Sequence, residues 1–305
     1  MQVITTVQEM LDARASWRVS DSVGLVPTMG YLHEGHLSLV REARAENEIL
    51  AVSIFVNPTQ FGPHEDLERY PRDLPRDLRM LEECHVDVVF TPTPADMYPP
   101  GFSTYVDPGG PLAEAVEGAA RPGHFRGVAT VVLKLFQIIQ PHRAYFGQKD
   151  AQQVAVISRM VADLNLPVML RILSTIREPD GLAMSSRNAY LTSPARASAT
   201  VLYKALLAGK QAFESQSASP ADVVRVMRET VAHEPLASLD YAEVRDPTTF
   251  LPLETLQAPA LLLIAASIGS TRLIDNFLLR ADGTWEMGIG QAQVRRLSIR
   301  KGTHI

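Results

Sequence analysis

Short apolar runs rich in Val and Ile alternate with longer stretches of helical periodicity over the first 175 residues of this chain. The runs occupy residues 23–27, 49–56, 86–90, 143–146 and 168–175, and the helical stretches cover residues 36–47, 75–85, 127–139 and 150–164. Strands that are apolar along their whole length are typical of parallel sheets with helices on both faces. The alternation therefore predicts βαβ units in a Rossmann-like, doubly wound α/β sheet, which binds ligands beyond the carboxyl ends of its strands.

The composition changes after about Thr175, where a polar turn ends the alternating pattern. Farther along, Ser219 is suited to cap a helix, and Pro220 and Asp222 are typical of a first helical turn. Helical and strand-like stretches of this part lie at residues 194–213, 239–244, 260–267 and 272–279. The last stretch, from residue 281, has few apolar residues and is typical of a solvated tail. We therefore expect a Rossmann-like domain at 1–175, a smaller α+β lid domain at 176–280 and a flexible tail at 281–305.

The overall composition excludes several classes of protein. The hydrophobic fraction is 46% and the charged fraction 21%, which is ordinary globular usage and unlike collagen or a coiled coil. The formal charge of -5 and the lack of a dense basic run before the tail argue against a nucleic-acid partner. Cys84 is the only cysteine, and no run of about 18 apolar residues occurs, so we expect a cytoplasmic protein without a disulfide framework or a membrane span.

The sequence His33-Glu34-Gly35-His36 follows the first predicted strand and begins the first long predicted helix. With eight histidines and eighteen glycines in 305 residues, this H-x-G-H pattern is not expected by chance. Histidines three residues apart share one face of a helical turn, and a helix N-terminus attracts anions. We predict that both histidines, in the protonated form favoured beside phosphate, donate to a triphosphate that Gly35 lets the backbone approach. A helix-capping or core role of both histidines is the alternative.

A second polar cluster, 147-GQKD, follows the strand predicted at 143–146 and therefore lies at the same sheet edge. Lys149 could reach the α-phosphate as a mobile point charge, and Gln153 lies one helical turn farther on. A surface Lys–Asp pair is the alternative. A third cluster, 184-MSSRN, supplies two hydroxyls and the guanidinium of Arg187 on one polar turn, where a surface turn is the alternative.

Two loops complete the candidate sites. The segment 57-NPTQF follows the second predicted strand, so Asn57 and Gln60 are placed to bind polar substrate groups, with Met29 as an apolar wall. A plain turn nucleated by Asn-Pro is the alternative. The loop 121-RPGHFRG brings Arg121, His124 and Arg126 together in the sequence and is typical of a lid or an anion clamp, or of an exposed loop.

Five motifs in this order resemble the pantothenate synthetase (pantoate–β-alanine ligase) family of the HxGH nucleotidyltransferase superfamily. They are PTMGYLHEGH, FVNPTQF, RPGHFRGVATVVLKL, YFGQKDAQQ and REPDGLAMSSRN, and the resemblance spans residues 1 to about 279. It implies a Rossmann-type N-terminal domain, a small C-terminal domain and a homodimer. It also implies that ATP and Mg²⁺ activate pantoate to a pantoyl adenylate, which β-alanine attacks to give pantothenate and AMP.

The resemblance further implies a role for each matching residue. The triphosphate would be bound by His33 and His36, and the charge around the transferring phosphorus would be neutralised by Lys149, Ser185, Ser186 and Arg187. The remaining nucleotide contacts would come from Met29, Gly35, Gly147, Asp150, Met184 and the backbone near Ile176. Pantoate would be held by Gln60 and Gln153, and the acid and amine pockets would be lined by Asn57, Tyr70 and Arg121.

The chain departs from the family pattern at two positions. Gln148 stands where the family often has Glu, and Ala151 stands where it often has an aromatic residue. We identify no residue that would deprotonate the attacking amine. Two other functions are compatible with an H-x-G-H helix: another nucleotidyltransferase of this superfamily, and a catalytically silent nucleotide-binding protein.

Overall fold

The computed structural model describes residues 1–63, 65–215 and 217–290, which fall into two compact units. The first unit comprises Met1–Gly109, Arg121–Gly147 and Val156–Leu173, and the second comprises Gly110–Ala120, Gln148–Ala155 and the residues from Ser174 onward. The boundary expected after residue 175 lies close to the start of this last segment. However, two segments of the expected first domain, at 110–120 and 148–155, belong to the second unit.

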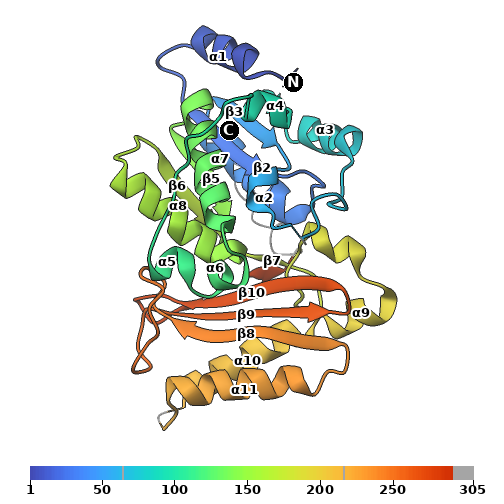
Figure 1. Cartoon of the computed structure of the whole chain (residues 1–305), viewed down its shortest axis with the longest axis vertical. Helices are drawn as coiled ribbons and strands as arrows, with labels where there is room; N and C mark the ends of the chain where they lie inside the picture. Colours follow the sequence, from blue (N-terminus) through green and yellow to red (C-terminus); the bar gives the residue numbers. More distant parts are fainter. Residues whose placement is uncertain (64, 216, 291–305) are drawn as a thin grey trace, which may run out of the picture. The chain divides into compact units, whose positions relative to one another are not determined.

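A parallel six-stranded sheet in the order β1-β4-β3-β2-β5-β6 forms the centre of the first unit (Figure 1). Its strands are β1 (Gln2–Ile4), β2 (Val23–Thr28), β3 (Ile49–Ile54), β4 (Val88–Phe90), β5 (Arg143–Gly147) and β6 (Met169–Leu173). Every apolar run expected to be a strand forms one, which confirms the Rossmann-like α/β fold; β1, with three residues, is too short to show a pattern. The strand order switches between β2 and β5, where ligands bind in such sheets.

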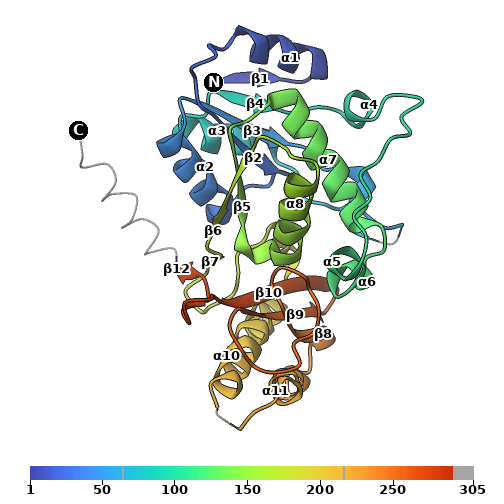
Figure 2. The ribbon, with the colours of Figure 1, turned by 90° about the vertical axis from the view of Figure 1, so that its left-hand side faces the viewer.

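Helices cover both faces of this sheet, with α2 and α3 on one side and α7 on the other (Figure 2). The helices of the first unit are α1 (Val7–Ser16), α2 (Glu34–Glu46), α3 (Leu74–Glu83), α4 (Pro94–Met97) and α7 (His124–Ile139), and α8 (Ala151–Asp163) continues into it from the second unit. α2 packs Leu39 and Val40 against Val26 of β2 and Leu81 of α3. Full burial of each such side chain contributes about 1.5–3 kcal/mol. No helix in the described ranges is long and apolar enough to cross a membrane.

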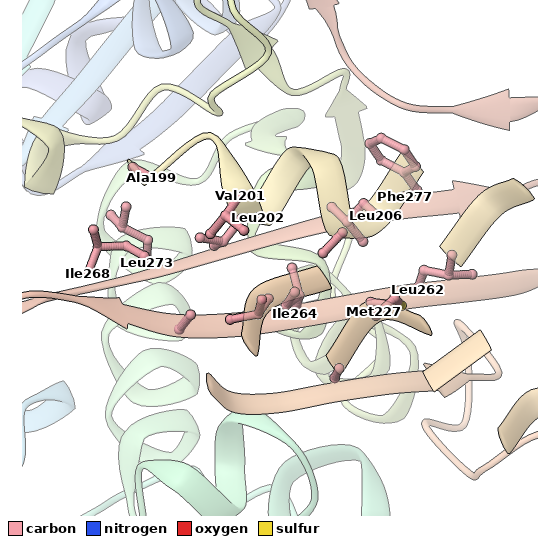
Figure 3. Close-up of a cluster of buried hydrophobic side chains, with 14 of the residues drawn as sticks. Ala199, Val201, Leu202, Leu206, Met227, Leu262, Ile264, Ile268, Leu273 and Phe277 are labelled. Carbon is pink, nitrogen blue, oxygen red and sulfur yellow. The ribbon is translucent and has the colours of Figure 1, made fainter. Parts of the chain in front are cut away.

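An antiparallel sheet in the order β11-β10-β9-β8 forms the centre of the second unit. Its strands are β8 (Ala237–Arg245), β9 (Ala260–Ile268), β10 (Thr271–Leu279) and β11 (Trp285–Glu286); its helices are α5 (Pro111–Glu114), α6 (Glu117–Ala120), α9 (Ser193–Ser198), α10 (Val201–Phe213) and α11 (Pro220–Ala232). α10 and α11 pack Leu202, Leu206 and Met227 against Leu262 and Phe277 of the sheet (Figure 3). Ser219 caps α11 as expected, since its side chain accepts from the Asp222 amide.

The described chain continues in strands through Gly290, which corrects the expectation of a flexible tail from residue 281. β11 pairs with the end of β10, and β12 (Ile289–Gly290) pairs in parallel with β7 (Ile176–Arg177). The sequence did not indicate these strands because two residues show no periodicity. The rest of the expected tail, residues 291–305, lies outside the described part of the chain.

Candidate functional site

The H-x-G-H segment forms the N-terminus of α2, directly after the loop that leaves β2. His33 is the N-cap, and its Nδ1 accepts a hydrogen bond from the Gly35 amide (3.1 Å). The His33 amide in turn donates to Nδ1 of His36 (3.4 Å), and the two rings lie 4.1 Å apart between centroids. The capping alternative considered for these histidines is thus realised, and their phosphate role stays a prediction.

The capping contacts show which ring nitrogen of each histidine faces the backbone. Nδ1 of both rings accepts a backbone N–H, so in the neutral imidazole the ring proton would be on Nε2. Both rings lie at the N-terminus of α2, the positive end of its dipole. Their predicted role as donors to a triphosphate stays a prediction.

The loop in front of α2 is held by Asp77, which the sequence analysis did not identify. The Asp77 carboxylate accepts hydrogen bonds from the amides of Tyr31 (2.7 Å) and Leu32 (2.8 Å). Gly30 adopts φ +80° beside it, and a Cβ there would lie 3.1 Å from Asp77 Oδ2. Burial raises the pKa of this carboxyl group, since it is 1% exposed. An acidic residue on the buried face of an amphipathic helix was the signal that could have revealed it.

Asn57 is buried and caps the 3-10 turn Pro58–Gln60, which follows β3. Its Oδ1 accepts from Tyr98 Oη (2.8 Å) and from the Thr59 hydroxyl (3.0 Å). Its Nδ2 donates to Gln60 Oε1 (3.1 Å). Asn57 is 1% exposed, so its side chain is held rigidly, and its hydrogen bond to Oε1 orients the side chain of Gln60. Both the turn-forming and the substrate-binding interpretations of this segment remain compatible with this geometry.

Gln60, Met29 and Tyr70 line the region after β2 and β3 in the first unit. Gln60 is 8% exposed and places Nε2 3.1 Å from the sulfur of Met29, the half-buried residue that follows β2. Met29 thus forms an apolar wall beside Gln60. Tyr70 is buried and packs edge-on against Phe61, with the ring centroids 5.9 Å apart.

Arg121 is held in place by an ion pair with Glu65, with Nη2 2.6 Å from Oε2. Arg121 Nη2 also donates to the Gln60 carbonyl oxygen (3.2 Å), and His124 Nδ1 lies 2.8 Å from the same oxygen. Arg126 is not part of this group, because its guanidinium stacks on Tyr105 at 4.0 Å from the ring centroid. The expected three-residue anion clamp is therefore corrected to a pair, Arg121 and His124, that braces the Gln60 backbone.

In the second unit, the turn Gln148–Asp150 continues directly from Gly147 at the end of β5 and leads into α8. The Lys149 side chain is 18% exposed, and its Nζ lies 3.4 Å from Asp150 Oδ1. A pair at this separation is weak and leaves the ammonium able to reorient. Gln153 is half-buried in the first turn of α8.

The 184-MSSRN turn begins next to the short strand β7. The Met184 amide donates to the Ile176 carbonyl oxygen (2.9 Å), which brings the two expected nucleotide contacts together. Ser185 caps the 3-10 helix Ser186–Tyr190 by accepting from the Arg187 amide (3.3 Å). Ser186 is buried, whereas Ser185 and Arg187 are half-buried.

Comparisons with known proteins establish the family. The pantoate-beta-alanine ligase family model matches residues 2–278. The chain belongs to this family. Pantothenate synthetases of Roseiflexus sp. strain RS-1 and Chloroflexus aggregans are 59% and 57% identical to it over 281 residues, which cover 92% of this chain and all of each relative. The crystal structure of the pantothenate synthetase from Thermus thermophilus is 50% identical, with a TM-score of 0.86, and the match covers 90% of this chain and 98% of that one.

A ligase of the same family has been solved with ligands. The structure of the pantoate-beta-alanine ligase from Francisella tularensis, in complex with beta-gamma ATP and beta-alanine, is 37% identical to this chain, with a TM-score of 0.77. The match covers 91% of this chain and 97% of that one.

The two departures from the pantoate-beta-alanine ligase pattern have local structural reasons. Gln148 Nε2 donates to Asn276 Oδ1 (3.2 Å), a contact that a glutamate in this conformation could not make without a proton. Ala151 is 7% exposed in an apolar cluster with Val116 and Phe250. An aromatic ring at position 151 would require this cluster to repack.

Proposed function

We propose that this ligase joins pantoate to β-alanine in two steps. A carboxylate oxygen of pantoate first attacks the α-phosphorus of ATP, and the bond to the bridging oxygen breaks to release pyrophosphate. The amine nitrogen of β-alanine then attacks the acyl carbon of the pantoyl adenylate. The bond from this carbon to the oxygen that bridges it to phosphorus breaks, so that AMP leaves with this oxygen, and the nitrogen loses a proton. This division is chemically sound because AMP is a far better leaving group than the oxide of a free carboxylate.

The capped H-x-G-H segment is the observation that carries this proposal. Nδ1 of His33 and of His36 accepts a backbone amide, and we propose that the Nε2–H groups of both rings are preorganised as donors. Preorganised donors stabilise charge that grows on departing pyrophosphate without a cost of reorganisation at the moment of reaction. We propose that both histidines bind the β- and γ-phosphates, next to the backbone of Gly35.

The polar groups of the second unit are proposed to act on the same nucleotide. Lys149 and Arg187 would neutralise charge around the α-phosphorus, and the hydroxyls of Ser185 and Ser186 would donate to its oxygens. Adenosine would be held by Gly147, Asp150, Met184 and the Ile176 backbone, with Met29 as an apolar contact.

Gln60 and Gln153 are proposed to hold pantoate by hydrogen bonds from their side-chain amides. Asn57 supports this role by fixing Gln60, and Arg121 supports it by bracing the Gln60 backbone. Tyr70 is proposed as an apolar contact of the amine pocket. We propose that Mg²⁺ arrives with ATP, since this ion prefers phosphate oxygens and water to an all-protein cage. A homodimer, as the family resemblance implies, and a cytoplasmic location, as the single cysteine indicates, complete the proposal.

Isotope exchange between pyrophosphate and ATP tests the two-step reaction. We expect labelled pyrophosphate to enter ATP only when pantoate is present, and β-alanine to yield AMP and pantothenate in equal amounts. The control omits pantoate. Exchange that is independent of pantoate would show instead a different nucleotidyl transfer, and nucleotide binding without any exchange or product would indicate a catalytically silent protein.

A further inference from the structure

Two buried polar residues, Asp275 and Asn276, interrupt the apolar strand β10. They are 3% and 2% exposed, whereas Leu273 and Phe277 of the same strand belong to the apolar core. Burial of a carboxylate and an amide is costly unless each finds hydrogen-bonding partners. Their partners are the two segments of the second unit that carry its proposed catalytic side chains.

Asn276 holds the turn that presents Lys149. Its Nδ2 donates to the carbonyl oxygens of Lys149 (2.8 Å) and Gln148 (3.0 Å), and its Oδ1 accepts from Gln148 Nε2. Both donor hydrogens of the Asn276 amide are therefore used on consecutive backbone carbonyls. This fixes the direction from which the Lys149 side chain leaves the backbone.

Asp275 holds the segment that leads to the 184-MSSRN turn. Its carboxylate forms a bidentate ion pair with Arg177 on β7, at 2.7 and 2.9 Å, and also accepts from the Asn276 amide (2.8 Å). Arg177 is 4% exposed and donates in addition to the Gly181 carbonyl oxygen (2.9 Å). Its neighbour Ile176 accepts the Met184 amide. The start of the turn is thus fixed through Arg177.

We propose that Asp275 and Asn276 are positioning residues for adenylate formation. Consecutive Cα atoms are about 3.8 Å apart at fixed geometry. Because Asp275 and Asn276 are adjacent on one strand, the two segments that they bind are held at a fixed separation from each other. β10 would thereby set the position of Lys149 relative to Ser185–Arg187. The inference rests on the proposed roles of these side chains, and it assigns to the C-terminal sheet a part in the first chemical step.

The Asn276→Asp variant tests this inference. The substituted side chain has nearly the same size but offers no donor to the two carbonyl oxygens, so the Lys149 turn should shift. A misplacement of about 1 Å can lower a rate by about 100-fold. We expect the kcat of pantoate-dependent exchange to fall by about 10- to 100-fold. Pantothenate formation from added pantoyl adenylate and β-alanine should stay within about twofold, since that step needs no pyrophosphate departure.

The ratio of the exchange rate to the rate of pantothenate formation from pantoyl adenylate distinguishes a positioning role from a loss of stability, because unfolding lowers both rates equally. Asn47→Asp is the matched control, because Asn47 is also a buried asparagine, 7% exposed, with its Nδ2 bonded to Ala43 O and Tyr145 Oη in the first unit. The control should lose stability and leave the ratio unchanged. Gln148→Ala, a milder second variant, should shift the ratio in the same direction as Asn276→Asp.

Three outcomes are informative. A selective loss of exchange in Asn276→Asp and Gln148→Ala supports the inference. Equal losses in both half-reactions, which leave the ratio of their rates unchanged, overturn it, and so does the absence of any loss. The proposed function is tested separately by the wild-type enzyme, because pantoate-independent exchange there contradicts the two-step reaction whatever the variants do.

Discussion

In the proposed site, each histidine of the H-x-G-H segment uses Nδ1 for capping and Nε2 for phosphate binding, and single substitutions can separate these two roles. In His36→Asn, the amide oxygen takes the place of Nδ1 and keeps the bond from the His33 amide, but the Nε2–H donor is lost. We expect the melting temperature to change by less than about 2 °C. Pantoate-dependent exchange should fall by about 100- to 1000-fold, the usual cost of a lost oxyanion donor.

His36→Gln is the complementary control for this prediction. Its side-chain amide can place an N–H near the original Nε2 position, but it has no acceptor at the Nδ1 position. We expect it to retain more exchange activity than His36→Asn and to be less stable. Thermal melts and exchange rates measured on both variants check this, and a more active Asn variant would contradict the assignment of Nε2 as the phosphate donor.

At the scale of residues, the sequence indicated candidate side chains but not their hydrogen-bonding partners. His33 and His36 were identified because a helix start after a strand is a general anion site. Which ring nitrogen faces the backbone was not predicted, because it depends on which backbone amides point at Nδ1. Asp77 and Asn276 were missed because their partners lie 45 and 127 residues away in the chain, a distance that no local pattern spans.

At the scale of elements, close packing of α7 on the turn after β3 depends on Gly127. A Cβ at this position would lie 2.3 Å from the Thr59 carbonyl oxygen and 2.7 Å from Gln60 Cα. Gly127→Ala must therefore push the Gln60 turn away from the helix. We expect an increase of about tenfold or more in the KM for pantoate, measured by initial rates.

Gly62→Ala is the matched control for this substitution. A Cβ there would meet Glu65 only at ordinary van der Waals distance, 3.5 Å or more. The control should leave the KM for pantoate unchanged. Equal effects of the two substitutions would contradict the argument from close approach.

The turn before the 184-MSSRN segment is tied to α9 by an acid-sensitive contact. Arg196 donates to Asp180 (2.8 Å) and thereby lowers the pKa of that carboxyl group below its ordinary value of 3.8. A carboxyl group with a lowered pKa in the folded state stabilises the fold above the unfolded value and loses this contribution as the pH falls through the folded value. Asp180→Asn should therefore cost about 0.5–1 kcal/mol at pH 7. The difference from wild type should begin to shrink as the pH falls to about 3.8 and should vanish below the lowered pKa of the folded state, which urea denaturation at several pH values would measure.

At the scale of the whole molecule, the sequence predicted the order of elements but not the membership of the units. The strands of the first unit were predictable because each is a continuous apolar run. The segment 110–120 was assigned wrongly because Glu117 forms its ion pair with Arg272, 155 residues later, at 2.8 Å. Such pairings depend on tertiary structure, so local periodicity in the sequence does not predict them.

The short strands after residue 280 lead to a prediction about the end of the chain. The family match ends at residue 278, but β12 pairs Ile289 with Ile176, and Arg177 Nε donates to the Met287 carbonyl oxygen. A chain ending at Leu279 loses these contacts beside the proposed adenosine contact Ile176. We expect its KM for ATP to rise by about tenfold or more, because the β7 segment is no longer held in place.

A chain ending at Gly290 should behave differently, since it keeps β11 and β12 and removes only residues 291–305. We expect its kcat and its KM for ATP to stay within about twofold of the full-length values, because the pairing of β11 with β10 and of β12 with β7 is kept. Initial rates and thermal melts of both truncated chains, compared with the full chain, measure the difference. If the two truncations had equal effects, the strands β11 and β12 would contribute nothing to nucleotide binding, and the boundary of the working enzyme would lie at the end of the family match.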